Sequence, residues 1–363
     1  MARPLMYHIA ERYRDQWLKP RDLNDLQQKR LRQTIGYAYR RVPYYHRLFR
    51  SLGVRPDDIR TIHDLTKIPI LTKKDAKDSL KSLLARGVER KQVEWYRTSG
   101  TTASPISVAK DVEYKRIINA LITRMKLAYS EKPWDKTMHI THPASTFRSG
   151  FRSQSLGVFR YMHTAFFRAV PLGRIDETED VMRSIRDFRP RVLQSHEFNL
   201  RLLSHYADSL RDGQKPRVIH TGQGEVEDNW TRRLLEDAFE CGVYAGYGSS
   251  EFSFHGFECR RQRGYHIHSD HILIEYLRDG EQVECGEAGE MVVTDLSNRA
   301  MSLIRYQLGD VGVPSCEPCP CGRGLPLLLS VEGRVEDFVV LPDSRILTPR
   351  QISSRLNAVR GVA

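Results

Sequence analysis

The sequence predicts an α/β fold in which a large core of helices and strands is followed by a β-rich part. Three observations support this prediction. β-forming runs alternate with helical patterns through the middle of the chain, which is typical of largely parallel strands joined by helices. After Glu251 the pattern changes to closely spaced β-type runs with a hairpin signal at Asp279-Gly280. The composition, 363 residues of which 40% are hydrophobic and 28% charged, is that of a globular protein with a sizeable core.

The first hundred residues read mainly as helices. Apolar positions recur at helical spacing through 5–35, and a second helical segment follows at 36–49 around a Val-Pro break. Residues 61–87 combine short helical stretches with a proline. Residues 93–96 are expected to form a strand that leads into a loop rich in hydroxyl side chains, and Val108 begins the returning strand.

The middle of the chain supplies the alternating pattern. Helices are expected at 113–129, 176–188, 197–212 and 226–240, and strands at 137–141, 191–194, 217–220 and 243–246. In the β-rich part we expect strands within 266–276 and 289–294.

The net charge is strongly positive, because 57 Lys and Arg residues against 45 Asp and Glu residues give +12. The basic residues are scattered and no nucleic-acid-binding motif accompanies them, so most are interpreted as solvated surface and a few as attracting anionic ligands. No apolar run approaches the roughly 20 residues of a membrane span, and the N-terminus lacks a signal-type apolar core. We therefore expect a cytoplasmic protein with neither a nucleic-acid nor a membrane partner.

The loop at 97–105 has the sequence Arg-Thr-Ser-Gly-Thr-Thr-Ala-Ser-Pro. Backbone N–H groups of such a loop can turn inward, and its hydroxyls can donate to phosphate oxygens. It is not the P-loop of the nucleotide triphosphatases, because the pattern G-x-x-x-x-G-K-[ST] does not occur in the chain. Alone, a Ser/Thr/Gly-rich loop is more often a surface turn. Three further motifs, which follow in a fixed order, favour a functional role for the loop.

These motifs are Tyr-Gly-Ser-Ser-Glu at 247–251, Tyr-Gln-Leu-Gly-Asp at 306–310 and Gly-Arg-Val-Glu-Asp at 333–337. Together with the hydroxyl-rich loop, the ordered set resembles the adenylate-forming superfamily, the acyl-CoA synthetases and their relatives. The segments at 40–45, 68–73 and 319–326 are similar to the phenylacetate-CoA ligase branch, which includes the CapK-like capsular polysaccharide proteins. The resemblance extends from about Leu31 to about Arg350.

The resemblance implies a large adenylate-forming domain of αβαβα layers with a β-rich subdomain, and most of the C-terminal lid missing. The expected parts are an N-terminal helical part at 1–95, an α/β nucleotide-binding core at 96–252, a β-rich subdomain at 253–333, and the hinge with the start of the lid at 334–363. The lid of the family carries a catalytic lysine, for which this sequence has no match. We expect the lid to be either cut off or absent by nature, and in the second case adenylation would be impaired.

The activity that the resemblance implies is ATP-dependent activation of a carboxylic acid to an acyl-adenylate, with release of pyrophosphate and transfer to CoA or an amine. ATP, Mg²⁺ and CoA would be the cofactors, and a homodimer is left open. The alternative is a zinc-stabilised nucleotide-binding protein without a catalytic lid, either non-catalytic or part of polysaccharide biosynthesis. The acid itself cannot be read from the sequence, although 142–151 and 195–198 are expected to line its pocket.

The resemblance implies a role for individual residues of these motifs. The loop that closes on the β- and γ-phosphates would contain Thr98, Ser99, Thr101 and Thr102. Glu251 would bind Mg²⁺, since a hard cation prefers carboxylate oxygen. Residues implied to contact the nucleotide are Gly222, Gly224, Glu225, Tyr247, Gly248, Ser250, Asp310 and Arg334. Among them, Tyr247 would stack near the adenine and Asp310 would accept hydrogen bonds from the ribose hydroxyls.

The cysteines give a separate signal. A disulfide framework is not expected in a cytosolic chain without a signal peptide. Three thiolates and one imidazole suit a closed tetrahedral zinc site with a structural role. The ligands chosen are Cys259, His266, Cys319 and Cys321, with Cys316 as the alternative. Reduced, unliganded cysteines are the competing interpretation, and Cys241 and Cys285 are taken as ordinary thiols.

Overall fold

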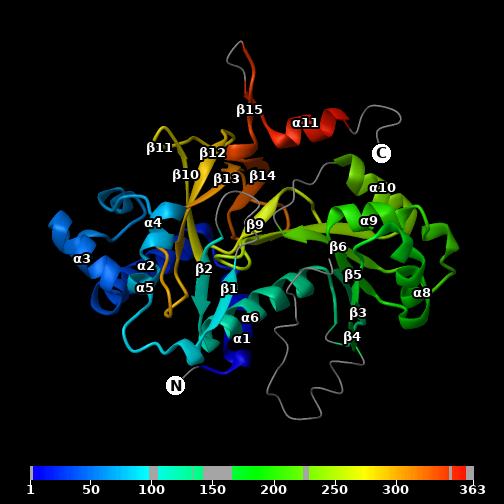
Figure 1. The fold of residues 1–363 in the computed structure, drawn as a ribbon, viewed down its shortest axis with the longest axis horizontal. Coiled ribbons are helices and arrows are strands. Elements are labelled where there is room, and N and C mark those ends of the chain that lie inside the picture. The colour runs from blue at the N-terminus through cyan, green and yellow to red at the C-terminus, as the bar shows by residue number, and fades with distance from the viewer. Residues whose placement is uncertain are drawn as a thin grey trace. The chain divides into compact units, whose positions relative to one another are not determined.

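The computed structural model describes residues 3–97, 105–132, 134–141, 166–223, 229–342 and 346–356, and its mixture of helices and strands confirms the α/β class (Figure 1). The chain divides into two compact units. The first unit comprises Met1–Met125 and Gly248–Pro349, and the second comprises Lys126–Tyr247 and Arg350–Ala363. The four-part division expected from the sequence stays a prediction.

The first unit begins with helices, as the apolar spacing predicts. These are α1 Leu5–Asp15, α2 Pro20–Arg41, α3 Pro43–Leu52, α4 Lys73–Asp78 and α5 Leu80–Leu83, with 3₁₀ turns η1 Pro56–Asp58, η2 His63–Lys67 and η3 Arg90–Gln92. The expected Val-Pro break separates α2 from α3, since Pro43 takes the first position of α3 and supplies no N–H to continue α2. The hairpin strands β1 Glu94–Arg97 and β2 Ser107–Lys110 follow, and then α6 Val112–Ala128 begins.

The β-rich part of the first unit is an antiparallel array with the order β11-β10-β12-β13-β14-β9-β8. Its strands are β8 Gly256–Glu258, β9 Tyr265–Ile267, β10 Ile272–Arg278, β11 Glu281–Gln282, β12 Gly289–Asp295, β13 Tyr306–Pro314 and β14 Leu327–Arg334. The expected turn at Asp279-Gly280 joins β10 to β11, and both residues have positive φ. The chain continues through η6 Val335–Asp337, the small hairpin β15 Val339–Val340 with β16 Ile346–Leu347, and α11 Pro349–Leu356.

Buried polar contacts hold the N-terminal helices to this sheet. The hydroxyl oxygen of Tyr45 on α3 accepts a hydrogen bond from the N–H of Ile304 at 2.8 Å. Arg12 of α1 and Arg124 of α6 both donate to the buried carboxylate of Asp270, at 3.1 and 2.8 Å. Burial would raise the pKa of Asp270, but the two guanidinium groups outweigh it and hold that pKa well below its usual range. The helices and the β-rich part therefore form one unit.

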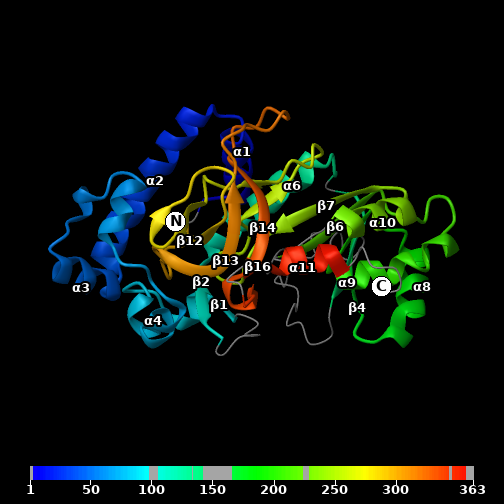
Figure 2. The same ribbon diagram turned by 90° about the horizontal axis from the view of Figure 1, so that it is seen from above.

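The second unit contains the parallel sheet that the alternation predicts, with the order β7-β6-β5-β3-β4. Its elements are β3 Thr137–Thr141, β4 Phe167–Pro171, η4 Ile175–Glu177, α8 Thr178–Phe188, β5 Val192–Ser195, α9 Glu197–Ser204, η5 Ala207–Ser209, β6 Val218–Gln223, α10 Asn229–Phe239 and β7 Gly242–Tyr247. Helices and strands share an apolar core that includes Ile185, Leu193 and Leu235. The ribbons of α8, α9 and α10 are labelled in Figure 2. Strand β4 is not among the predicted strands. It lies at the sheet edge and buries too few of its side chains to give an alternating pattern.

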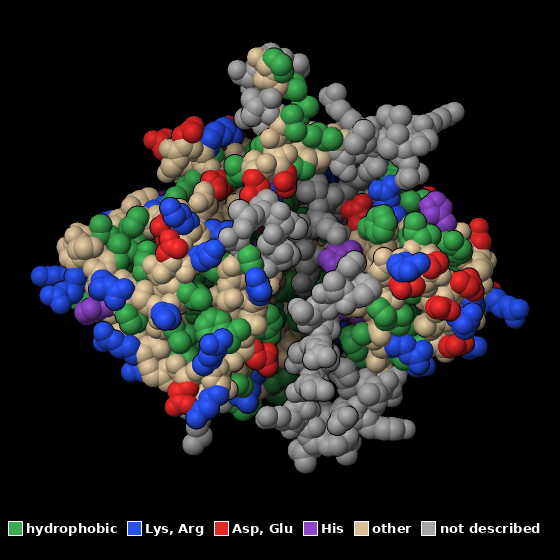
Figure 3. All heavy atoms as spheres, in the orientation of Figure 1, with side chains coloured by type: hydrophobic (Ala, Val, Ile, Leu, Met, Phe, Trp, Pro, Cys, Tyr) green, Lys and Arg blue, Asp and Glu red, His purple; other side chains and the backbone are tan. Residues whose placement is uncertain are grey.

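The surface agrees with the interpretation of the positive charge. On the face drawn in Figure 3, Lys and Arg side chains are interspersed with Asp and Glu side chains. Within the described residues, none of the helices is both long enough and apolar enough to cross a membrane.

Candidate functional site

Glu251 lies in a tight turn, residues 248–255, which we call the Glu251 turn. The N–H of Ser253 donates to the carbonyl of Ser249 at 2.8 Å, and this bond closes the turn. A Cβ on Gly248 would lie 2.2 Å from the carbonyl oxygen of Ser253, so only glycine fits there. Ser250 is exposed at the tip. The glycine and the small hydroxyl residues of the motif thus produce a compact turn that presents Glu251.

The carboxylate of Glu251 is buried and fixed. Its Oε1 accepts a hydrogen bond from the hydroxyl of Tyr306, the first residue of β13, at 3.1 Å. Burial raises the pKa of Tyr306 well above its usual range, and the neighbouring carboxylate adds to the shift. Tyr306 therefore remains a hydrogen-bond donor at all ordinary pH values. A buried carboxylate held in one orientation is a suitable ligand for a hard cation such as Mg²⁺.

Asp310 and Arg334 are cross-strand partners on β13 and β14. The Nε of Arg334 lies 3.4 Å from Oδ1 of Asp310, and the arginine side chain is 44% exposed while that of the aspartate is 12% exposed. Gly309 precedes Asp310 with φ of +85°, a conformation that favours glycine. The pair combines a nearly buried acceptor with a solvent-accessible cation, as a site for ribose hydroxyls and phosphate would require.

Lys110 is a residue of this region that sequence reasoning missed. It ends β2, its side chain is buried, and its Nζ donates to the carbonyl of Ser250 and to Oγ of Ser253, both at 2.7 Å. Burial lowers the pKa of Lys110 to about 8, although the carboxylates of Asp295 and Glu251 oppose the shift. The sequence offers no signal for it, because a lysine at the end of a short strand usually points to solvent.

The other predicted nucleotide-binding residues lie in the second unit or outside the described residues. Gly222 is in β6, at a register shift between β6 and β7. Tyr247 ends β7 and is buried. The predicted residues outside the described ranges are Thr98, Ser99, Thr101, Thr102, Gly224 and Glu225. The stretch 142–151, expected to line the acid pocket, also lies outside them.

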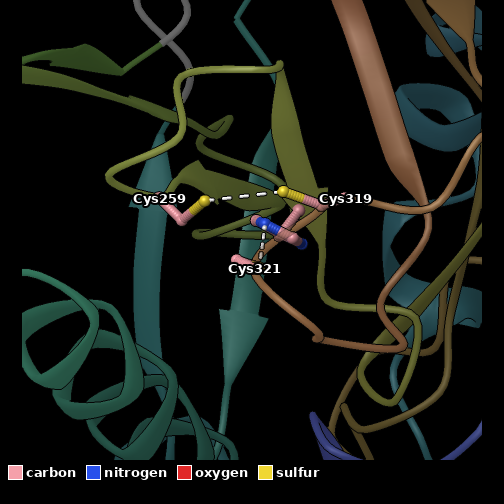
Figure 4. Close-up of side chains that lie close together, drawn as sticks. Cys259, Cys319 and Cys321 are labelled. Carbon is pink, nitrogen blue, oxygen red and sulfur yellow. Dashed lines mark hydrogen bonds between the residues drawn. The ribbon is translucent and has the colours of Figure 1, made fainter.

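The four predicted zinc ligands form a second cluster, which we call the cysteine-histidine cluster: Cys259, His266, Cys319 and Cys321. Their ligand atoms all lie within 4.8 Å of one another (Figure 4). The Sγ atoms of Cys259 and Cys319 are 3.7 Å apart, and Sγ of Cys321 lies 3.4 Å from Nε2 of His266. The structure thus brings together residues that are up to 62 positions apart in the sequence.

Three separate segments position the cluster. Cys259 follows β8, His266 lies in β9, and Cys319 and Cys321 occupy the loop between β13 and β14. The N–H of Gly322 donates to the carbonyl of Cys319 at 3.1 Å, which folds this loop into a turn. The cluster therefore adds side-chain proximity to segments that the backbone pairing of β9 with β8 and β14 already joins.

The electrostatics differ among the three cysteines: the pKa values of Cys259 and Cys319 are raised, chiefly by burial, whereas that of Cys321 is lowered. Burial raises the pKa of Cys259 to about 12. Burial also raises the pKa of Cys321, but hydrogen bonds with His266 and Arg323 outweigh it and lower that pKa to about 5. Three sulfur atoms and one imidazole nitrogen, largely buried, match a closed tetrahedral zinc site.

The remaining two cysteines near this loop correct the sequence analysis. Cys285 and Cys316 form a disulfide with a Cα–Cα distance of 5.6 Å. Expecting no disulfide, treating Cys285 as an ordinary thiol and keeping Cys316 as an alternative zinc ligand were therefore wrong. The reason is the sheet: the N–H of Gly286 donates to the carbonyl of Pro314 at 2.8 Å, which brings the loop before β12 against the end of β13. Sequence spacing alone does not reveal this contact.

Curated proteins related to the chain are ligases. The phenylacetate-coenzyme A ligase of Thermus thermophilus is 29% identical over 355 residues, which cover 94% of this chain and 76% of the relative. The enzymes of the same name from Pseudomonas putida and Escherichia coli are 26% and 27% identical and cover 98% and 92% of this chain, and 81% and 76% of their own lengths. No protein-family model matches the chain.

Solved structures agree in fold. A 2-hydroxyisobutyryl-CoA ligase in the postadenylation state, in complex with 2-HIB-AMP, is 18% identical with a TM-score of 0.79, covering 96% of this chain and 75% of that one. The O-succinylbenzoate coenzyme A synthetase of Bacillus subtilis, in complex with ATP and a magnesium ion, is 17% identical with a TM-score of 0.50, covering 73% and 54%. The chain is similar in sequence to phenylacetate-CoA ligases and shares its fold with solved CoA ligases, as the ordered motifs predict.

Proposed function

We propose that this relative of the phenylacetate-CoA ligases activates a carboxylic acid with ATP and transfers the acyl group to CoA. The observation that carries the proposal is the similarity to enzymes of this name over more than nine-tenths of the chain. It is supported by the local geometry, because Glu251 and Asp310 lie on or against the same strand, β13, in the sequence motifs that suggested their roles.

In the first half-reaction a carboxylate oxygen of the substrate attacks the α-phosphorus of ATP. The bond from that phosphorus to the bridging oxygen breaks, and pyrophosphate leaves. In the second, the thiol of CoA loses its proton and attacks the acyl carbon, and AMP leaves with the electron pair of the acyl–oxygen bond. The protein has to hold the triphosphate and balance the charge that develops on it.

The residues in the first unit fit parts of this task. The fixed carboxylate of Glu251 would hold Mg²⁺, which when bound supplies positive charge to the phosphates. Asp310 would accept hydrogen bonds from the ribose hydroxyls, and Arg334 would approach the ribose or a phosphate from the exposed side. The hydroxyls of Thr98, Ser99, Thr101 and Thr102 would donate to the β- and γ-phosphates.

The cysteine-histidine cluster is proposed as a structural zinc site. Three thiolates and the imidazole of His266 would fill the four positions of a tetrahedral ion, which leaves none for a substrate or water. The metal would fasten the β13–β14 loop to the end of β8 and to β9. Its contribution would be to the stability of the first unit, not to the chemical steps.

The experiment is acid-dependent formation of an acyl-CoA. The chain is incubated with ATP, Mg²⁺, CoA and aryl, short-chain or sugar-derived acids in turn, and AMP release and the thioester are measured. We expect at least one acid to give both products in equal amounts. Equal AMP release with and without every acid, and no thioester, would contradict the proposal. AMP release with an amine acceptor but not with CoA would support adenylation and would identify an amine, in place of CoA, as the acceptor.

A further inference from the structure

Lys110 makes contacts that an ordinary surface lysine does not make. It is 2% exposed, and both of its hydrogen bonds go to the Glu251 turn. The carbonyl of Ser250 and the hydroxyl of Ser253, each 2.7 Å from Nζ, are the acceptors. These acceptors belong to the residue immediately before Glu251 and to a residue two positions after it. The ammonium group therefore holds the backbone before Glu251 and a side-chain hydroxyl after it.

The surroundings of the ammonium group explain how a buried charge is tolerated there. Its Nζ lies 4.4 Å from the ring centroid of Tyr96 and 5.5 Å from that of Tyr114. The carboxylates of Asp295 and Glu251 attract it. Aromatic faces and two carboxylates offset part of the cost of removing an ammonium group from water. Such an arrangement is unnecessary for filling space, since a methionine of similar length would pack without desolvating a charge.

The position of Lys110 in the fold adds a second connection. Strand β2 pairs with β1 in antiparallel register, from Arg97 opposite Ser107 to Glu94 opposite Lys110. In sequence, the hydroxyl-rich loop joins these two strands. The lysine thus bonds a strand that follows the predicted phosphate loop to the turn that carries the predicted magnesium ligand.

Tyr114 reinforces the same turn from α6. Its hydroxyl donates to the carbonyl of Phe252 at 2.8 Å, so three carbonyl or hydroxyl groups around Glu251, on Ser250, Phe252 and Ser253, accept hydrogen bonds from the β2–α6 segment. The tyrosine bond is neutral, whereas the lysine bonds are charge-assisted and are therefore the stronger restraint.

We propose that Lys110 is a positioning residue for the reaction: it fixes the Glu251 turn against β2 and so sets the place at which Glu251 binds Mg²⁺ with ATP. This inference rests on the proposed function, because it assigns Lys110 to the magnesium ligand of the same site. It makes a prediction whose sign distinguishes it from simple electrostatics. A nearby cation repels Mg²⁺, so charge alone would make Mg²⁺ bind more tightly once the lysine is removed. Positioning predicts weaker binding.

The test is calorimetry of ATP binding, with Mg²⁺ and with EDTA, to the wild-type chain and to Lys110→Met. In Mg²⁺ we expect the variant to bind ATP ~10-fold more weakly, and in EDTA within about twofold of wild type, as loss of a charge-assisted restraint on a metal ligand predicts. Ser253→Ala removes one acceptor and keeps the ammonium group, so it should shift the Mg²⁺-dependent affinity in the same direction by less. Ser253→Ala is the test variant if Lys110→Met does not fold.

Lys115→Met is the matched control. Lys115 is an ion-pair partner of Glu94, and in the described part of the chain it makes no hydrogen bond or ion pair with the Glu251 turn, so its loss should leave both affinities unchanged. Equal Mg²⁺-dependent affinity in wild type and Lys110→Met would show that the lysine only stabilises the fold, and tighter binding would show that repulsion dominates. Either result overturns the inference. Absence of Mg²⁺-dependent ATP binding in the wild type would instead contradict the proposed function itself.

Discussion

The cysteine-histidine cluster and the Glu251–Asp310 region lie in the same compact unit. They differ in the arrangement and the exposure of their side chains. In the cluster, four ligand atoms face one another within 4.8 Å, and three of the four residues are buried. In the Glu251–Asp310 region, Glu251 has Tyr306 as a donor, and Asp310 faces an arginine that is 44% exposed. In the first arrangement the four ligand atoms face one another, as the proposed zinc site requires. In the second, the arginine is accessible to solvent, as the proposed nucleotide contact requires.

Under the proposed roles, the cluster should contribute stability and the Glu251–Asp310 region should contribute chemistry. A closed set of four ligands gains its free energy when the chain folds around the metal. An open set of polar groups gains free energy mainly when its ligand binds, and contributes little to the fold before that. Changes in the cluster should therefore alter unfolding, whereas changes near Glu251 should alter binding and rate.

Removal of zinc should produce the largest effect. The purified protein is expected to contain one zinc per chain, and chelation or Cys319→Ser should reduce the free energy of unfolding by ~3 kcal/mol or more, because three ligands remain without their ion. Elemental analysis and thermal unfolding measure both quantities. A zinc content near zero, with a melting temperature that chelator does not change, would remove the metal from this account.

Glu251→Gln should leave the fold intact and impair the reaction. The amide oxygen can still accept from Tyr306, but the neutral group is a poor ligand for Mg²⁺. We expect the rate of adenylate formation to fall by at least ~100-fold, the scale at which metal-site residues act. Melting temperature serves as the control and should change little. A variant with the wild-type rate would show that the magnesium ligand lies elsewhere.

The disulfide provides a test of the ligand choice in the cluster. Cys316→Ser removes the bond to Cys285 and should reduce the free energy of unfolding by about 2 kcal/mol in the absence of reductant, the usual scale for a disulfide. In the presence of reductant, wild type and variant should unfold alike, and zinc content should be unchanged in both. Loss of zinc from Cys316→Ser would make Cys316 a ligand after all.

Asp310→Ala should have the smallest of these effects. Loss of an acceptor for the ribose hydroxyls should weaken ATP or AMP binding by at least ~1 kcal/mol, the scale of a lost charged hydrogen bond. Arg334 is exposed and already has Glu336 within 3.8 Å, so it can find another partner and the fold should persist. Calorimetry with each nucleotide measures the change, and equal affinities would remove Asp310 from the site.

Much of the fold could be predicted because it rests on local periodicity. The alternation of helical and β-type runs predicted the parallel strands β3, β5, β6 and β7, and the turn at Asp279-Gly280 predicted a hairpin. β4 was missed because an edge strand with partly exposed side chains has no clear pattern.

The candidate sites, too, could be predicted only in part. The spacing of Cys319 and Cys321, with the family resemblance, was enough to select four residues that the structure brings together. Strand pairing between distant segments produces the disulfide between Cys285 and Cys316 and the buried contacts of Lys110. Composition and residue spacing therefore do not predict them. Burial of a charge is decided by the tertiary fold, and here it marks a residue next to the proposed magnesium ligand.

Acid-dependent exchange of labelled pyrophosphate into ATP tests the central proposal, adenylation of a carboxylic acid, most directly. It reports formation and reversal of the acyl-adenylate without requiring a choice of acceptor. The account predicts exchange that needs Mg²⁺ and one class of acid and that is lost in Glu251→Gln. Exchange that proceeds equally without any acid, or its absence with every acid while ATP still binds with Mg²⁺, would contradict carboxylate adenylation and would leave a nucleotide-binding protein in its place.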